Sequence, residues 1–128
     1  SIDLTVVLFA TSVGLLSVAV LNLNNMRDIE NDINSSKITL AVRLGDYKAK
    51  VYHFFLISIA IILFFIGIGE QPLLIKTIYT LVFVPLFLHL YRVFNVKEPK
   101  QFDPELKKLA LTIFFISIVF FVTSYLNQ

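Results

Sequence analysis

The sequence contains no cysteine, which excludes a disulfide framework, a thiolate metal site and a cysteine nucleophile. Charged residues are also scarce: they make up 16% of the 128 residues, whereas 57% are apolar, and the mean hydropathy is +0.81. Soluble domains carry about 25% charged and roughly 45–50% apolar residues. The composition therefore predicts a membrane protein.

The apolar residues fall into four long runs. We predict transmembrane helices at residues 4–23, 51–68, 72–94 and 106–126, each near the roughly 17–25 residues that cross a bilayer. Apart from the charged ends of the last two segments, the only charge within them is Lys76, whose side chain can reach the interface. We expect one all-α membrane domain, a multi-pass helix bundle in which residues 24–50 form the first loop.

The basic residues are distributed unevenly between the two sides of the predicted membrane. Ten of the eleven lie in the loop 24–50 or at and between the third and fourth spans. They are Arg27, Lys37, Arg43, Lys48, Lys50, Arg92, Lys97, Lys100, Lys107 and Lys108. Positive residues favour the cytoplasmic side. We therefore expect the loop in the cytoplasm and both chain ends outside, in the inner membrane of a cell.

The first loop carries a regular stripe of oxygen-bearing side chains. Asn24, Asp28 and Asp32 are four residues apart, which places them on one face of a helix that we expect to continue to about Asn34. Two carboxylates held this close repel each other when both are ionised. Mg²⁺ removes that conflict and accepts both carboxylate and phosphate oxygens. The spacing fits a metal-bound anion at the membrane surface.

A solvated, charged helix end is the commoner explanation of such a pair. The neighbouring cations favour the metal site, because Arg27, Lys37 and Arg43 could all bind a phosphate group. Carboxylates for a metal together with cations for a phosphate predict a diphosphate site.

The run N-N-x-R-D-x-x-x-D, followed by K-x-T-L-A-V-R-L-G, resembles the second aspartate-rich motif of the UbiA superfamily of intramembrane prenyltransferases. The sequence of this motif is most similar to that of the 1,4-dihydroxy-2-naphthoate polyprenyltransferase branch, which serves menaquinone biosynthesis. The later D-P-E-L-K-K-L-A-L resembles the start of that branch's last helix, with Asp103 expected as the N-cap. Ser36 departs from the motif, which usually has glycine there, and predicts a stiffer loop.

The resemblance implies a nine-helix bundle in which two aspartate-rich motifs face each other and hold Mg²⁺ on a polyprenyl diphosphate. Asp28 and Asp32 would be the catalytic metal ligands. The expected diphosphate-binding residues are Asn24, Asn25, Arg27, Lys37 and Arg43. The polyprenyl chain would pass to an aromatic acceptor, most simply 1,4-dihydroxy-2-naphthoate. With four spans and one motif, the chain is expected to be a C-terminal portion that needs the N-terminal helices of the same enzyme and is inactive alone.

Other interpretations stay open at this stage. The same superfamily uses 4-hydroxybenzoate, haem or a glycerol phosphate as acceptor, and a transporter or a non-catalytic membrane partner could also bind cations at an acidic helix end. Nothing indicates nucleic-acid binding. We expect His53 to be an interfacial aromatic residue and His89 to form hydrogen bonds within the bundle.

Overall fold

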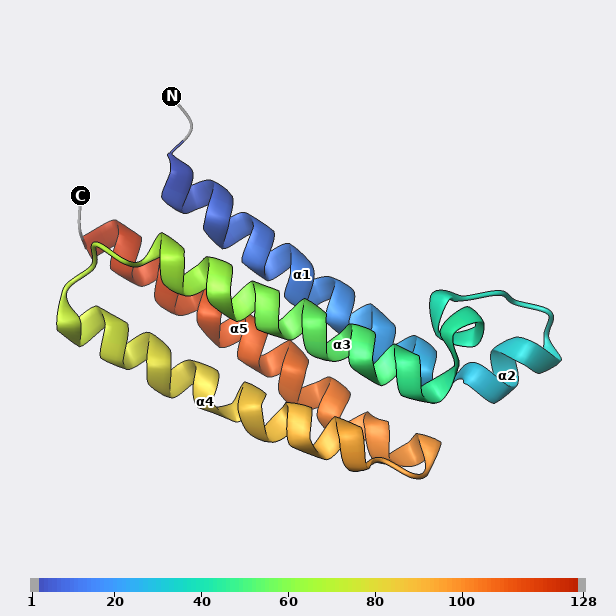
Figure 1. The fold of residues 1–128 in the computed structure, drawn as a ribbon. Coiled ribbons are helices and arrows are strands. Elements are labelled where there is room, and N and C mark those ends of the chain that lie inside the picture. The colour runs from blue at the N-terminus through green and yellow to red at the C-terminus, as the bar shows by residue number, and fades with distance from the viewer. Residues whose placement is uncertain (1–2, 127–128) are drawn as a thin grey trace.

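The computed structural model describes residues 3–126 and shows four long helices side by side, joined by short connections at the two ends (Figure 1). The elements are α1 (Leu4–Arg27), α2 (Ile29–Asn34), α3 (Leu40–Gly67), α4 (Leu73–Asn95), η1 (Pro99–Gln101) and α5 (Phe102–Leu126). In the described residues, α1, α3, α4 and η1 with α5 provide four segments that are long and apolar enough to cross a membrane. The expected all-α, multi-pass membrane fold is confirmed.

Helices α1 and α3 make the most extensive helix–helix contact of the bundle, and small residues at this contact let the backbones approach closely. Ala19, Ala49 and Ala60 are fully buried, and a Cβ atom added at Gly67 would lie 3.3 Å from Cβ of Leu8. Such small-residue contacts are typical of helix pairs in lipid, where apolar burial alone does not drive association. The predicted site lies at the C-terminal end of α1, beyond this contact.

Two polar side chains of α1 cross this contact. Ser12 Oγ donates to the carbonyl of Ala60 at 2.8 Å, and Asn22 Nδ2 donates to the carbonyl of Ala49 at 3.0 Å. Both side chains are buried, so each bond satisfies a group that would otherwise be costly in an apolar interior. The bonds hold α1 in register with α3 up to the last turns before Asn24.

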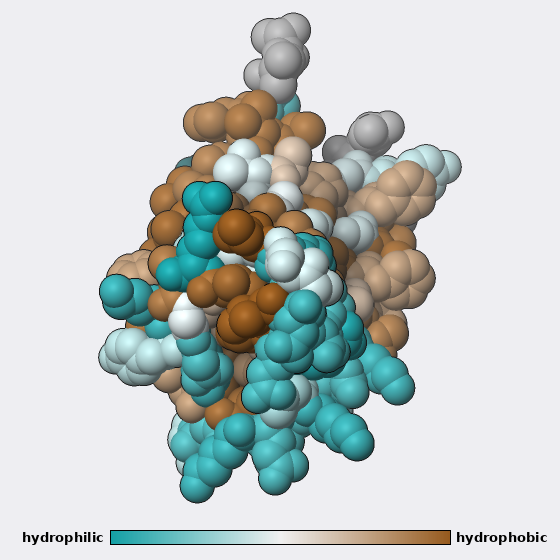
Figure 2. All heavy atoms as spheres, turned by 90° about the vertical axis from the view of Figure 1, so that its right-hand side faces the viewer, coloured by the Kyte–Doolittle hydropathy of each residue, from teal (hydrophilic) through white to brown (hydrophobic). Residues whose placement is uncertain are grey.

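The two ends of the bundle differ in character. Viewed from the end that carries α2, polar and charged residues gather on the surface while apolar side chains cover the flanks (Figure 2). The ends of α1 and α4 and the starts of α3 and α5 meet there (Figure 1). The motif loop and the basic residues around α5 thus share one end of the molecule.

Gly45 has a positive φ of 75° inside α3 and separates a short turn from the membrane-length helix. Two other helix boundaries differ from those expected. The first helix does not continue to Asn34 without interruption, because the backbone breaks at Asp28 (φ −99°, ψ 9°) and α2 begins at Ile29. Asp103 is not an N-cap, since α5 already begins at Phe102.

Candidate diphosphate and metal site

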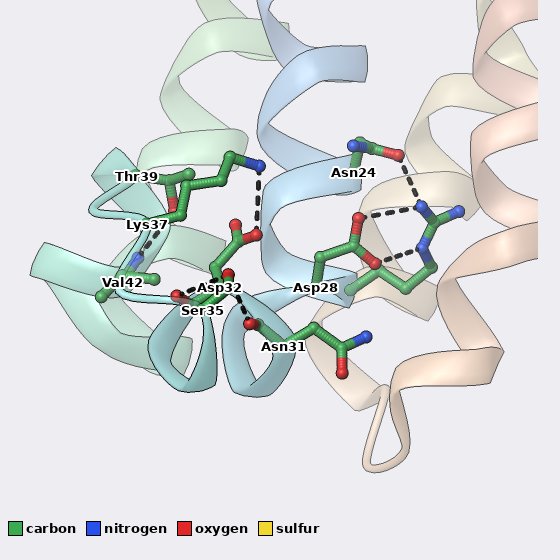
Figure 3. A network of polar contacts seen from close by, with 9 residues as sticks. Asn24, Asp28, Asn31, Asp32, Ser35, Lys37, Thr39 and Val42 are labelled. Atoms are coloured by element: carbon green, nitrogen blue, oxygen red, sulfur yellow. Dashed lines mark hydrogen bonds and ion pairs between the residues drawn. The ribbon is translucent and has the colours of Figure 1, made fainter.

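The motif residues stay in helical register across the break between α1 and α2. The N–H of Asp28 donates to the Asn24 carbonyl at 3.1 Å, and the N–H of Asp32 donates to the Asp28 carbonyl at 2.8 Å. The four-residue spacing is therefore kept in the backbone, while the break turns the short α2 away from the axis of α1 (Figure 1). Asp28 and Asp32 consequently direct their carboxylates to two different cations (Figure 3).

Asp28 is held by Arg27. Nε of Arg27 donates to Oδ1 of Asp28 at 2.8 Å, and Nη2 donates to Oδ2 at 3.0 Å. Nη2 also donates to Oδ1 of Asn24 at 2.7 Å. These hydrogen bonds hold the pKa of Asp28 below its ordinary value, against the opposing effect of partial burial. Asp28 is therefore a carboxylate at neutral pH, which a metal ligand must be.

Asp32 lies in a different environment. Its side chain is 7% exposed, and Oδ1 accepts a hydrogen bond from Nζ of Lys37 at 3.0 Å (Figure 3). The other oxygen, Oδ2, is buried and has no hydrogen-bond partner. A buried carboxylate oxygen without a partner costs free energy unless another positive group reaches it. Oδ2 of Asp32 is therefore an atom of the motif that could bind a ligand from outside the described residues.

The turn after α2 brings Lys37 back to Asp32. The N–H of Lys37 donates to the Asp32 carbonyl at 2.8 Å, and Ser36 adopts a positive φ of 57° to close the turn. Ser36 is the one residue other than glycine with positive φ in the described chain. This conformation explains why glycine suits the position, because a Cβ atom is disfavoured there.

The remaining predicted residues are less engaged. Arg43 is exposed on the short turn that precedes Gly45, and Asn25 is half-buried beside the stripe. Within residues 3–126 neither side chain makes a hydrogen bond or ion pair. Thr39 starts the turn by accepting a hydrogen bond from the Val42 N–H at 3.3 Å. The structure thus joins Asn24, Arg27 and Asp28 in one cluster and Asp32 with Lys37 in another.

These residues fit a hard cation in their chemistry. Asp28 and Asp32 offer carboxylate oxygens, the ligands that Mg²⁺ prefers, and Oδ2 of Asp32 is unpaired. Among the described residues no group of three or more His, Asp or Glu side chains could complete a metal site. Mg²⁺ usually keeps water and substrate phosphates as ligands, so two carboxylates suffice from the protein.

Comparison with known proteins decides the family. Residues 1–119 match the UbiA prenyltransferase family. The chain belongs to this family. It is 40% identical over 122 residues to 1,4-dihydroxy-2-naphthoate octaprenyltransferase of Haemophilus influenzae, covering 94% of this chain and 39% of that protein.

Two shorter matches carry the same name. The enzyme of Escherichia coli is 55% identical over 47 residues, covering 37% of this chain and 15% of that protein. The enzyme of Mycobacterium tuberculosis is 43% identical over 63 residues, covering 49% and 22% respectively. This UbiA chain therefore matches the C-terminal portion of longer relatives and spans about two fifths of the first. No solved structure matches it significantly.

Sequence reasoning missed Asp103, which this UbiA chain places against the motif. Nη1 of Arg27 donates to Oδ1 of Asp103 at 3.0 Å, across 76 positions of sequence. The D-P-E signal was interpreted as a helix start, and the pairing with Arg27 becomes visible only once α1 and α5 are side by side. Lys50, predicted only as one of the basic residues of the first loop, is buried and donates to Asp46 and to the Val96 carbonyl, each at 2.8 Å.

The two histidines form a buried cluster with Glu105. His53 is fully buried, so the expectation of an interfacial aromatic residue was wrong, whereas His89 does form hydrogen bonds within the bundle. No local spacing relates these residues, because they lie on α3, α4 and α5. His53 and His89 are 36 positions apart in the sequence, and His89 and Glu105 are 16 apart, so no local pattern predicts the cluster.

Proposed function

We propose that this chain is the C-terminal part of a Mg²⁺-dependent polyprenyltransferase that acts on 1,4-dihydroxy-2-naphthoate in menaquinone biosynthesis. In this proposal Asp28 and Asp32 are metal ligands, and Asn24, Asn25, Arg27, Lys37 and Arg43 bind the diphosphate of the prenyl donor. The observation that carries it is the unpaired buried Oδ2 of Asp32, four residues from an ionised Asp28, in a family member. The name shared by the relatives supports the choice of acceptor.

The reaction would transfer an allylic chain to an aromatic ring. The C–O bond of the donor breaks, diphosphate leaves, and a ring carbon of the acceptor attacks the allylic carbon while the ring carboxylate leaves as CO₂. Mg²⁺, when bound, would supply positive charge to the departing diphosphate. The residues of this chain would neutralise the remaining phosphate charge through Arg27 and Lys37 and orient it at the membrane surface.

The position of the site also supports the proposal. The motif lies at the charged end of the bundle, directly beyond the last apolar turns of α1 (Figure 2). A diphosphate could bind in the polar layer while its polyprenyl chain extends along apolar helices, where water is excluded from a developing carbocation. We further propose that this end faces the cytoplasm of the cell and that the facing half of the site lies in an N-terminal portion.

To test the proposal, this chain is fused in frame to the N-terminal part of the H. influenzae relative. That part is the portion that the match leaves uncovered. We call this product the fused enzyme. Membranes containing it should release pyrophosphate and form prenylated naphthoquinol from octaprenyl diphosphate and 1,4-dihydroxy-2-naphthoate. The 128-residue chain alone should form none. A folded fused enzyme that forms no product with this acceptor, or that prenylates 4-hydroxybenzoate in preference, would contradict the proposal.

A further inference from the structure

The guanidinium group of Arg27 is shared between two carboxylates, one at the break between α1 and α2 and one on α5. One edge, Nε with Nη2, binds both oxygens of Asp28 at 2.8 and 3.0 Å. Nη1 binds Asp103 of α5 at 3.0 Å, and the second hydrogen of Nη2 is taken by Asn24 at 2.7 Å. Of the five N–H donors of an arginine, these contacts use four.

This arrangement places Arg27 in competition with a metal ion for the charge of Asp28. Each oxygen of Asp28 accepts one hydrogen bond from Arg27 and keeps a second lone pair, so a cation that binds there shares the carboxylate with the guanidinium and weakens these hydrogen bonds. The arginine side chain is long and flexible, so Arg27 needs other partners to stay in place once its contact with Asp28 is lost. Asp103 and Asn24 approach the guanidinium from outside the Asp28 contact, so they can keep it in place when Asp28 turns away.

The first turn of α5 gives Asp103 a firm base for this task. Two residues further on, Glu105 is buried and its Oε2 lies 2.9 Å from Nδ1 of His89 on α4. Lys108 donates to the other oxygen of Glu105 at 2.7 Å. The start of α5 is therefore fixed to α4 on its inner side, while Asp103 extends from the same turn toward α1.

We infer that Asp103 is a positioning residue that holds Arg27 beside the diphosphate site, so that the Asp28 carboxylate can pass from Arg27 to the metal ion. The inference rests on the proposed metal site. Asp103 touches neither the cation nor the substrate in this scheme, and it acts through Arg27. Without Asp103, the charge of Arg27 is no longer shared with a second carboxylate, so its existing hydrogen bonds to Asp28 strengthen and it competes more strongly with the metal.

A purely structural role explains the contact less well. The side chains of Arg27 and Asp103 are 31% and 51% exposed, and exposed ion pairs add little to the stability of a fold. Replacing Asp103 by Asn should therefore leave the bundle folded and change the competition between Arg27 and the metal ion for Asp28. Glu98→Gln is the matched control, because it removes one negative charge from the same end of the bundle, keeps the side-chain oxygen that caps η1, and involves no hydrogen bond or ion pair with Arg27.

The experiment measures the affinity for Mn²⁺, which shares the oxygen ligands of Mg²⁺ and is visible by electron paramagnetic resonance. The fused enzyme is titrated with Mn²⁺ alone, without substrate, and the signal of an Asp28→Asn, Asp32→Asn double variant is subtracted. Asp103→Asn should weaken Mn²⁺ binding by about two- to fivefold. Asp103→Glu should restore part of the affinity, and Glu98→Gln should leave it unchanged.

The decisive comparison places Asp103→Asn in a background without the arginine. In Arg27→Gln the loss of Asp103 should have no further effect on Mn²⁺ affinity, because the group through which it acts is gone. If that background does not fold, Arg27→Lys serves, since lysine lacks the forked donor. An equal effect of Asp103→Asn with and without Arg27, or no difference from Glu98→Gln, would overturn the inference. A wild-type protein that binds no Mn²⁺ would instead overturn the proposed metal site itself.

Discussion

His53 on α3 and His89 on α4 face each other with their Nε2 atoms 2.9 Å apart, inside the bundle. The chain of contacts continues from Nδ1 of His89 to Glu105 at 2.9 Å. All three side chains are buried. We infer that Glu105 accepts from Nδ1–H of His89 and that Nε2 of His89 accepts from Nε2–H of His53. Nδ1 of His53 then has no hydrogen-bond partner among the described residues.

This order of contacts predicts unequal effects of removing the two rings. His89→Phe leaves the inner face of Glu105 and both nitrogens of His53 without a partner, and should cost about 2–3 kcal/mol of stability. His53→Phe removes a nitrogen that is already unpaired and leaves only Nε2 of His89 without its partner, so it should cost about 1 kcal/mol. Thermal unfolding of the fused enzyme in detergent measures both. A larger loss for His53→Phe would contradict this order of contacts.

Much of the fold could be predicted because long apolar runs leave few choices in a bilayer. Backbone groups in lipid must be satisfied within a helix, so four runs of the right length imply four helices. The break at Asp28 was not predictable in the same way. Next to the break, Arg27 contacts a carboxylate 76 positions away, and Lys37 returns to Asp32; a local pattern contains neither contact.

Part of the site could be predicted from the sequence for a related reason. The four-residue spacing of Asn24, Asp28 and Asp32 is local, and the backbone keeps it. Burial is not local. Asp32 was expected at a solvated helix end, yet its side chain is 7% exposed because the turn through Ser36 closes over it. Asp103 and Glu105 were interpreted as helix-start residues, and their partners on α1 and α4 are set by packing alone.

Ser36 offers a direct test of strain in the motif loop. Its φ of 57° is unfavourable for a side chain with a Cβ atom and comfortable for glycine. The greater freedom of glycine in the unfolded chain offsets part of that gain. Ser36→Gly should therefore raise the stability of the fused enzyme by up to about 1 kcal/mol. Ser35→Gly is the control and should destabilise, because Ser35 donates to the Asn31 carbonyl at 2.9 Å. A loss of stability in Ser36→Gly would contradict the strain.

The orientation of the bundle can be tested in a background that contains no natural cysteine. Asn34 ends α2 at the charged end, and Glu70 lies in the turn between α3 and α4 at the opposite end; both are exposed. In intact cells, Glu70→Cys should react with a membrane-impermeant maleimide. Asn34→Cys should react only after the membrane is opened. Labelling in the reverse order would place the motif on the outer side.

The Arg27–Asp28 pair predicts how stability depends on pH. Because the pKa of Asp28 is lowered in the folded state, the pair contributes fully above the ordinary aspartate pKa of about 3.9 and is lost as pH falls through the lower folded value. The difference in stability between wild type and Asp28→Asn should be constant from about pH 7 to about pH 5 and shrink below about pH 4. Melting curves of the fused enzyme across this range measure it. A difference that grows on acidification would reverse the sign of the pKa shift.

Replacement of Asp28 or of Asp32 should lower activity to a similar degree, whereas the two replacements should differ in their effect on stability. Asp28→Asn and Asp32→Asn each remove the charge of a proposed Mg²⁺ ligand while keeping its shape, and each should lower turnover by about 100-fold or more. Asp28→Asn also loses a charged pair at 26% exposure, so a small loss of stability is expected. Asp32→Asn keeps an oxygen for Lys37 and replaces the unpaired Oδ2, so its stability should hardly change. Pyrophosphate release by the fused enzyme, with unfolding followed in parallel, separates the two effects. Near-normal turnover in both variants would defeat the metal site, whereas a loss of turnover matched by unfolding would assign these residues to the fold.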